Sequence, residues 1–313
     1  MMTKNRIYLL ILAVAMIFAG LVMPYWFSFL VTVALAKGLV VLGLVILMRA
    51  GLVSFGQGLY YCAGAYAVGA FSDYFKTDNL LLLLLVAIVC ALVISSIVGL
   101  LLSRYRDIFF AMFSMAFSMI LYGILVKSAA LGSSDGFNVV SPTFFGWTVH
   151  ASGGNMLTYW AAIVLAFLVG AVIWRYFKSP MGMAGEAIRE NEIRVEYLGI
   201  SVQKVIYIKY IIAAVLASLG GAITAMTVGH IDPEMAYWTT SGEFVFIALM
   251  AGTGHVAAPL VGAIIFELLR TFAFQVSPYT WQMILGIALL AIIIFLPNGL
   301  WSLKEKLMKG AKS

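Results

Sequence analysis

The chain contains little charge. Lys, Arg, Asp and Glu supply only 10% of its 313 residues, against about 25% in a soluble domain. Apolar residues make up 64%, and the mean hydropathy is +1.06. So few charges cannot cover that much apolar surface in water, which excludes a soluble enzyme, a disordered chain and a nucleic-acid-binding protein. The composition predicts an all-α polytopic membrane protein that uses lipid as its solvent.

Cysteine and histidine are also scarce. Cys62 and Cys90 both lie inside apolar stretches, and His150, His230 and His255 are scattered, so we expect neither a disulfide framework nor a metal site. The chain has no Gly-x-x-x-x-Gly-Lys phosphate loop and no cluster of acids, histidines and nucleophiles. We therefore expect no catalytic residues and no bound cofactor, so the energy for any transport comes from a partner or a gradient.

Long apolar runs dominate the sequence instead. They are continuous rather than alternating, which favours helices of about 20 residues over barrel strands. The first run follows Lys4 and Arg6 as in a signal peptide, but its small-residue pattern at 13–15 lies inside the run, so we expect a retained span. One domain over 1–313 with about 8–10 transmembrane helices is predicted. Its segments are 7–23, 29–48, 52–71, 80–102, 108–131, 157–177, 207–229, 243–251, 256–272 and 281–297.

The distribution of Lys and Arg predicts the topology. Basic residues concentrate in 175–209 and in the tail after 303, and Arg49, Arg104 and Arg106 mark two further turns. The loops 132–156, 230–242 and 274–280 contain neither Lys nor Arg. We expect the basic segments and both termini on the cytoplasmic side, and the three uncharged-or-acidic loops outside.

The pair 243–251 and 256–272 is irregular. The predicted topology makes it leave from the outside and return there, yet nine residues of helix reach only about 14 Å across a core of about 30 Å. Either the first helix begins earlier or the pair is re-entrant. The breakers are Gly252, Thr253, Gly254 and Pro259, with His255 beside them. Broken helices at membrane depth need burial in protein or a cavity, so this segment is a candidate for the transport path, with a plain tight hairpin as the alternative.

A similar glycine-rich stretch occurs earlier in the chain. Gly51-Leu-Val-Ser-Phe-Gly-Gln-Gly leads to Gly64-Ala65, as Gly252-Thr-Gly leads to Gly262-Ala263. Internal repeats are common in transporters. The weak repeat adds further candidates for the path: Ser54, Phe55, Gly56 and Gln57.

The segment 178–206 predicts a short amphipathic helix between two spans. A helical stripe runs through Ala184, Ile188, Asn191, Val195 and Leu198, and Gly199 is a plausible stop. Such a helix either docks a cytoplasmic partner or lies on lipid. The mixed signs of the surrounding charges and the narrow stripe favour a protein partner.

The same segment carries a family resemblance. Gly185-Glu-Ala-Ile-Arg-Glu-Asn-Glu, followed by Leu198-Gly-Ile, resembles the cytoplasmic loop of branched-chain amino-acid ABC transporter permeases, of the LivM type in particular. The resemblance runs from about residue 30 to the end. Further matching motifs are Gly51-Leu-Val-Ser-Phe-Gly-Gln, Ser134-Asp135-Gly136, Ile231-Asp-Pro-Glu, Gly262-Ala263 and Leu296-Pro-Asn-Gly-Leu300.

The resemblance implies a permease subunit of an ATP-driven importer of branched-chain amino acids in a prokaryotic cytoplasmic (inner) membrane. It also implies partners: a second homologous permease, two cytoplasmic ATPase subunits that use ATP and Mg, and a periplasmic or extracellular solute-binding protein. The residues expected to couple to the ATPase are Gly185, Glu186, Ala187, Ile188, Arg189, Glu190, Asn191, Leu198 and Gly199. Those expected to dock the binding protein are Asp135, Gly136, Asp232 and Glu234. A urea or short-chain amide importer and a stand-alone secondary carrier are the alternatives.

Two features depart from the family pattern. The family has Gly-Pro at the break, whereas here Ala258 precedes Pro259, and Lys37 lies in the middle of a predicted span. An ionisable residue inside a membrane marks a functional site by default. Lys37 faces either the path or the partner permease, paired with an acid such as Glu267, or is held at a subunit interface for structural reasons. Lys127 and Lys209 lie near span ends, where we expect them to snorkel to the membrane surface.

Overall fold

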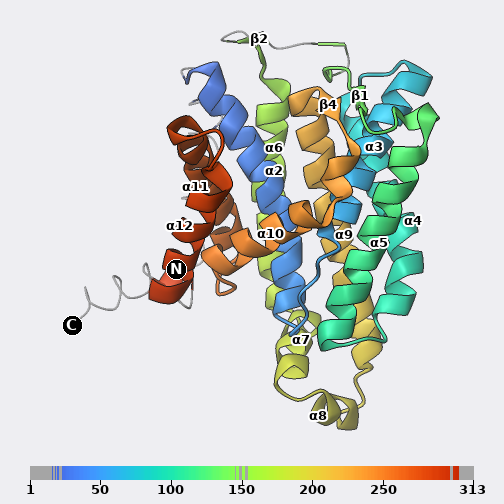
Figure 1. The fold of residues 1–313 in the computed structure, drawn as a ribbon. Helices are drawn as coiled ribbons and strands as arrows, with labels where there is room; N and C mark the ends of the chain where they lie inside the picture. The colour runs from blue at the N-terminus through green and yellow to red at the C-terminus, as the bar shows by residue number, and fades with distance from the viewer. Residues whose placement is uncertain are drawn as a thin grey trace.

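The computed structural model describes residues 23–296 except 145, 148, 149, 152 and 153, together with 16, 18, 20 and 299–302. The predicted first span and the basic tail therefore lie almost wholly outside the described residues. Within them, six helices are long and apolar enough to cross a membrane. They are α2 (Tyr25–Met48), α4 (Leu80–Leu102), α5 (Asp107–Lys127), α6 (Leu157–Phe177), α9 (Val202–Val228) and α11 (Ala257–Val276). With α3 (Gln57–Phe75), α10 (Trp238–Ala251) and α12 (Trp281–Phe295), they confirm an all-α multi-pass membrane protein (Figure 1).

The centre of the bundle is formed by α2, α3 and α9. In α2, 94% of the most apolar window is buried, against 28% in α4 and 22% in α5, which lie at the edge. Small residues allow these backbones to approach closely. A Cβ on Gly43 of α2 would lie 2.8 Å from the carbonyl oxygen of Ala213 in α9. A Cβ on Gly221 of α9 would collide with the carbonyl oxygen of Tyr61 in α3.

Short strands gather at one end of the bundle (Figure 1). After α5 and the 3-10 turn η1 (Ala129–Leu131), β1 (Phe137–Asn138) pairs antiparallel with β4 (His230–Ile231), which follows α9. β2 (His150–Ala151) pairs with β3 (Gly154–Asn155). The tight fit needs glycine at 136, because its φ is +68° and a Cβ there would collide with the carbonyl oxygen of Ile231. The pairing brings the Asp135–Gly136 turn beside the segment that enters α10.

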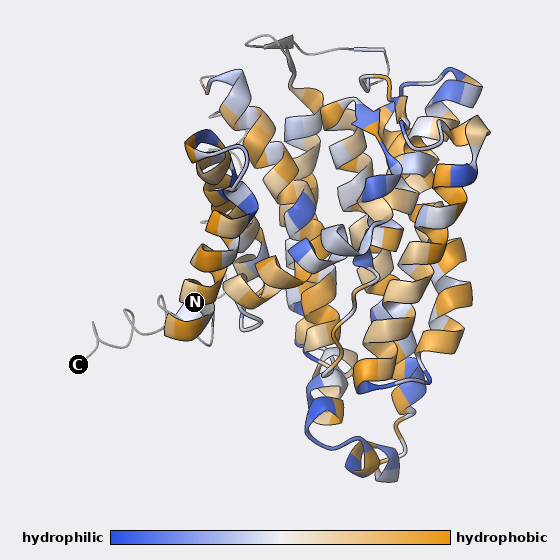
Figure 2. Cartoon of the chain, viewed as in Figure 1, coloured by the Kyte–Doolittle hydropathy of each residue, from blue (hydrophilic) through white to orange (hydrophobic). Residues whose placement is uncertain are grey.

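The predicted single helix in 178–206 is wrong, because the structure has two helices at the opposite end of the bundle. α7 (Pro180–Glu190) and α8 (Glu192–Tyr197) are separated at Asn191, whose φ of −161° and ψ of 103° are not helical. Its side chain accepts a 2.9 Å hydrogen bond from the backbone N–H of Arg194 and so caps α8. Figure 2 shows this end and the strand end as the hydrophilic regions, with mostly apolar helices between them.

The irregular pair resolves in favour of the earlier start. The 3-10 turn η2 (Pro233–Ala236) leads into α10, which begins at Trp238 rather than at 243 and has 14 residues, or about 21 Å of helix. Ser118, near the middle of α5, donates a 2.7 Å hydrogen bond to the carbonyl of Ala236. Figure 1 shows α10 starting midway along the bundle. The irregular segment and α10 thus lead together from the strand end toward the end of α2, where the break contacts Arg49, and α11 follows the break.

Candidate functional site

The exposed side of α7 and α8 differs from the side that sequence periodicity selects. Ser179 caps α7 by accepting from the backbone N–H of Gly182, and Pro180 opens the helix. The stripe residues Ala184, Ile188 and Val195 are buried against the rest of this chain. Of the residues expected to couple, Gly185 and Ile188 are buried, and the exposed ones are Glu186, Ala187, Arg189, Glu190, Asn191, Leu198 and Gly199.

Sequence periodicity missed the apolar side chains on this exposed surface. They are Met183, Ile193, Tyr197 and Leu198, with Tyr197 88% and Leu198 73% exposed. Only Leu198 belongs to the predicted stripe, because the break at Asn191 rotates α8 relative to α7. We call Met183, Ile193 and Tyr197, together with the seven exposed coupling candidates that include Leu198, the loop surface.

A buried lysine of α9 packs against α7. Lys209 of α9 is fully buried, and its Nζ lies 3.5 Å from the carbonyl oxygen of Gly182 and 5.2 Å from the ring centroid of Tyr176. A Cβ on Gly185 would collide with the end of the Lys209 side chain, so a larger residue there would displace that buried lysine. The prediction that Lys209 snorkels is therefore wrong, whereas Lys127 is exposed at the end of α5.

α8 is held separately. Arg106, in the turn between α4 and α5, donates to both carboxylate oxygens of Glu192 at 2.8–3.1 Å. This paired geometry is the strong form of an arginine–carboxylate contact. The segment that contains α7 and α8 is therefore held by two parts of the bundle: by Lys209 of α9 and by Arg106 in the turn between α4 and α5.

Arg49 connects α7 to the break between α10 and α11. Its Nε and Nη2 donate to the carbonyl oxygens of Thr253 and Gly254, both at 3.0 Å. Its Nη1 lies 3.1 Å from Oε1 of Glu186, and the guanidinium lies 4.0 Å from the ring centroid of Phe177. Partial burial lowers the pKa of Arg49 and the neighbouring Glu186 opposes the shift, so the side chain stays charged at physiological pH. The sequence had indicated only a topological role for this residue.

The closing motif of the chain packs on the same break. The backbone N–H of Leu300 donates 2.8 Å to the carbonyl of Met250, and a Cβ on Gly299 would lie 2.5 Å from the amide nitrogen of Gly252. The ring of His255 stacks on Trp301 at 4.6 Å. Pro297 and Asn298 lie outside the described residues, and Pro259 is buried in the first turn of α11. Arg49 and the closing motif thus contact the break, while Gly254 and His255 themselves remain exposed.

A second irregular segment lies at mid-depth. Ser54 is fully buried and accepts from the backbone N–H of Gly56, and the N–H of Phe55 donates 3.1 Å to Ser114 of α5. Gln57 is 1% exposed, and neither polar atom of its carboxamide has a hydrogen-bond partner among the described residues. The N–H of Gly58 donates 2.9 Å to Ser241 of α10. The first predicted path segment therefore contacts the start of α10, whereas the second, from Gly252 to Pro259, lies at the other end of that helix.

Lys37 lies in a buried cluster of four charges. Its Nζ is 2.6 Å from Oε1 of Glu243 and 2.5 Å from Oε1 of Glu267, which confirms the predicted partner. Arg270 approaches the same two carboxylates at 3.4 and 3.7 Å. The side chains of Lys37 and Glu267 are 8% and 10% exposed, whereas Glu243 and Arg270 reach the surface of the chain at 23% and 39%. Two charges of each sign cancel, as a membrane interior demands.

The four docking candidates separate by depth. Asp135 is exposed at the strand end, where Ser134 donates to its carboxylate at 3.1 Å. Asp232 lies deeper, beside Cys62 and Tyr66 of α3, and its buried Oδ1 has no partner among the described residues. Glu234 is exposed but belongs to η2, at the depth of Ser118. Asp135 and Gly136 thus lie at the strand end of the bundle, whereas Asp232 and Glu234 lie deeper.

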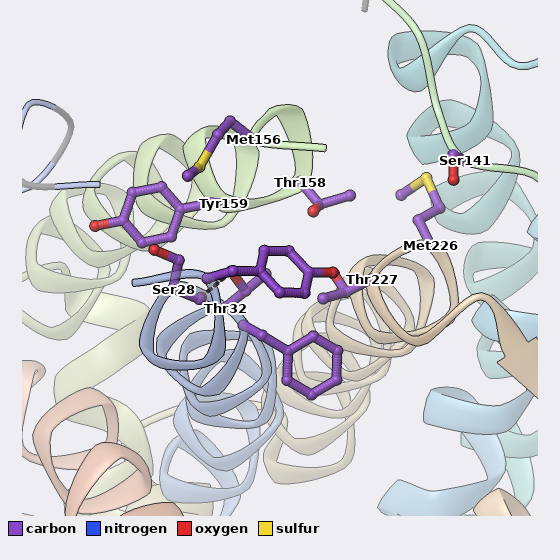
Figure 3. Close-up of a pocket in the computed structure, with 10 residues that line it drawn as sticks. Ser28, Thr32, Ser141, Met156, Thr158, Tyr159, Met226 and Thr227 are labelled. Carbon is purple, nitrogen blue, oxygen red and sulfur yellow. Dashed lines mark hydrogen bonds between the residues drawn. The ribbon is translucent and has the colours of Figure 1, made fainter. Parts of the chain in front are cut away.

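A small cavity opens between the outer ends of α2, α6 and α9 (Figure 3). Its volume is about 70 Å³. Ser28 and Thr32 from α2 face Thr158 and Tyr159 from α6 across it, and the hydroxyl of Ser28 has no partner among the described residues. The cavity was not predicted, because hydroxyl residues inside apolar runs carry no periodic signal. The described residues include no group of His, Cys, Asp or Glu that could hold a metal ion.

Comparison with known proteins identifies the family. The family described as branched-chain amino acid transport system / permease component matches residues 26–293. The chain belongs to this family. It is 26% identical to the LivM permease protein of Escherichia coli (strain K12) over 86% of this chain and 69% of that protein. It is also 26% identical to the LivH permease protein of the same strain over 80% of this chain and 85% of that protein. No solved structure matches the chain.

A further relative has a different solute in its name. The guanosine permease protein NupQ of Bacillus subtilis (strain 168) is 30% identical over 34% of this chain and 32% of its own. All these relatives are transport permeases rather than enzymes. The permease role predicted from the sequence is therefore confirmed, and the solute requires a separate argument.

Proposed function

We propose that this permease serves an ATP-driven importer of branched-chain amino acids in a prokaryotic cytoplasmic membrane, with both termini inside. Its partners would be a second homologous permease, two ATPase subunits that bind ATP and Mg, and an external solute-binding protein. The family match over 26–293 is the observation that carries the solute class. The named solutes of LivM and LivH, which align over most of this chain, outweigh that of NupQ, which aligns over a third.

The loop surface is the proposed ATPase contact. Its apolar side chains Met183, Ile193, Tyr197 and Leu198 are exposed and need a partner. Lipid is a poor partner for this surface, because anionic headgroups attract basic helices. Acids outnumber the basic residues on α7 and α8: Glu186, Glu190, Glu192 and Glu196 against Arg189 and Arg194. A protein groove with some positive charge fits this pattern.

The proposed path follows the face formed by α5, η2 and α10. Glu234 is exposed near mid-depth, and Glu243 and Arg270 are partly exposed in the apolar part of the chain. Charged groups at such depth face a protein or a water-filled cavity, not lipid. The second permease would cover this face, so that a solute passes between the two subunits. Lys37 would hold the carboxylates of Glu243 and Glu267 in position at this face.

The test reverses charge on the loop surface. Arg189→Glu and Glu190→Lys should each lower uptake of leucine, isoleucine and valine at least fivefold in vesicles that contain the complete transporter. Co-purification of the ATPase should weaken in parallel, while capture of solute by the binding protein stays unchanged. Normal uptake with a normal ATPase complement would contradict the proposal. Uptake of urea or short amides in place of the three amino acids would support the alternative solute class.

A further inference from the structure

Three segments far apart in sequence meet at one guanidinium. Arg49 follows the last residue of α2, Glu186 lies on α7, and Thr253 and Gly254 form the break between α10 and α11. The carbonyls of Thr253 and Gly254 follow the end of α10, where the helix provides no partners. Gly252 turns the chain there with a φ of +86°. Arg49 is thus the described side chain that ties the loop surface to the break.

The geometry makes this connection stiff. A guanidinium is planar, and its donors have fixed directions, so it cannot follow one acceptor without turning away from another. Phe177, the last residue of α6, lies against the guanidinium at 4.0 Å and limits its rotation. The Arg49 side chain is 17% exposed, although its hydrogen bond to Gly254 lies at the surface, and Glu186 is 55% exposed and accessible to a docked partner.

We infer that Arg49 is the positioning residue that transmits movement of α7 to the break between α10 and α11. A partner that pulls or turns α7 moves the Glu186 carboxylate. Arg49 follows, and the carbonyls of Thr253 and Gly254 either move with it or lose their donors. Because α10 and α11 carry Glu243, Glu267 and Arg270, a shift of the break changes the proposed path. The inference rests on the ATPase contact proposed for the loop surface.

The test uses Arg49→Gln in the complete transporter reconstituted in vesicles, with solute uptake and ATP hydrolysis measured on the same sample. Gln keeps part of the side-chain volume but loses the fork. We expect ATPase association and hydrolysis within twofold of the unaltered protein, and transported solute per ATP reduced at least fivefold. Arg49→Lys should be intermediate, because an ammonium has no planar fork to hold both sides. An unchanged amount of solute per ATP in Arg49→Gln would overturn the inference.

Two further variants separate the possible outcomes. Arg104→Gln is the matched control: Arg104 is an exposed arginine in the turn after α4 whose side chain makes no hydrogen bond or ion pair to the described residues, so transport per ATP should not change. Glu186→Ala removes the α7 side of the connection and serves if Arg49→Gln fails to assemble. Because Glu186 also belongs to the loop surface, the measured quantity is solute transported per ATP rather than ATPase association. The double variant should be no worse than Arg49→Gln alone, because contacting residues in one pathway are not additive. Additive losses would also overturn the inference.

The failure of this inference can be distinguished from failure of the proposed function. If Arg189→Glu leaves ATPase association intact, the loop surface is not the ATPase contact and the proposed function fails. If Arg189→Glu weakens association but Arg49→Gln keeps solute per ATP unchanged, only the role of Arg49 is refuted.

Discussion

Removal of the Lys37 ammonium should destabilise the protein strongly. Lys37→Met would leave the carboxylates of Glu243 and Glu267 with Arg270 alone, at 3.4 and 3.7 Å and with 39% of its side chain exposed. Breaking a buried pair by removing one partner costs about 3–5 kcal/mol, because the remaining charge is uncompensated. We expect a loss of this size, seen as a fall of about 5 °C or more in the thermal unfolding midpoint in detergent.

A second substitution tests the cause. Lys37→Met combined with Glu267→Gln leaves one acid and one arginine, so charge is balanced again, and at least half of the lost stability should return. Lys127→Met, at the exposed end of α5, is the control and should change stability by about 0.5 kcal/mol or less. A Lys37→Met variant within about 1 kcal/mol of the unaltered protein would refute the reasoning.

The balanced double variant also decides what Lys37 does. If it folds and transports normally, Lys37 has a structural role only. If it folds but its solute selectivity or rate changes in vesicles, the lysine belongs to the path. The comparison works because the double variant removes the ammonium without leaving the cluster with excess negative charge.

Two glycine positions give further predictions, beside those for the loop surface and Arg49. Gly185→Val should collide with Lys209 and displace α7, which lowers the stability by about 1–3 kcal/mol and weakens ATPase association. The control Ala187→Val, on the exposed side of α7, should keep the stability. Equal stability of the two variants would contradict the packing described. Gly136→Ala should cost about 1–3 kcal/mol from its left-handed backbone and from the collision with Ile231, and hydrogen exchange at β1 and β4 should accelerate; unchanged protection of these strands would count against it.

Charge counting predicted much of the fold. The positions of Lys and Arg located the loop surface, and the scarcity of both in three loops matches the strand-rich end of the bundle. The sequence left the start of α10 open between an earlier residue and a re-entrant pair, because Trp238-Thr-Thr-Ser-Gly is too polar to count as a membrane span. This turn is packed against α3 and α5, so the hydroxyl of Ser241 bonds to the N–H of Gly58 rather than facing lipid. Hydropathy measures the cost of contact with lipid and does not register protein neighbours.

The site was predicted only in part, for a similar reason. Periodicity placed Asn191 on the apolar stripe of one continuous helix. In the structure its side chain caps the start of α8, and the spacing of apolar residues cannot distinguish such a cap from a residue inside a helix. The Lys37–Glu267 contact could be anticipated, because one buried charge requires another. Arg49 could not be assigned a role, because its acceptor at Thr253 is 204 residues away in the chain. A contact over such a distance becomes visible only when the helices are assembled.

The glycine contacts at the centre of the bundle limit how the protein can move. Where Gly43 meets Ala213, and Gly221 meets Tyr61, main chain touches main chain with no side chain between them. Flexible side chains can change rotamer to let helices slide, but backbones in contact cannot, because packed cores do not deform continuously. α2, α3 and α9 should therefore move as one rigid body. The conformational change of a transport cycle is then confined to the segments around this body, above all α10 and α11 with the break between them.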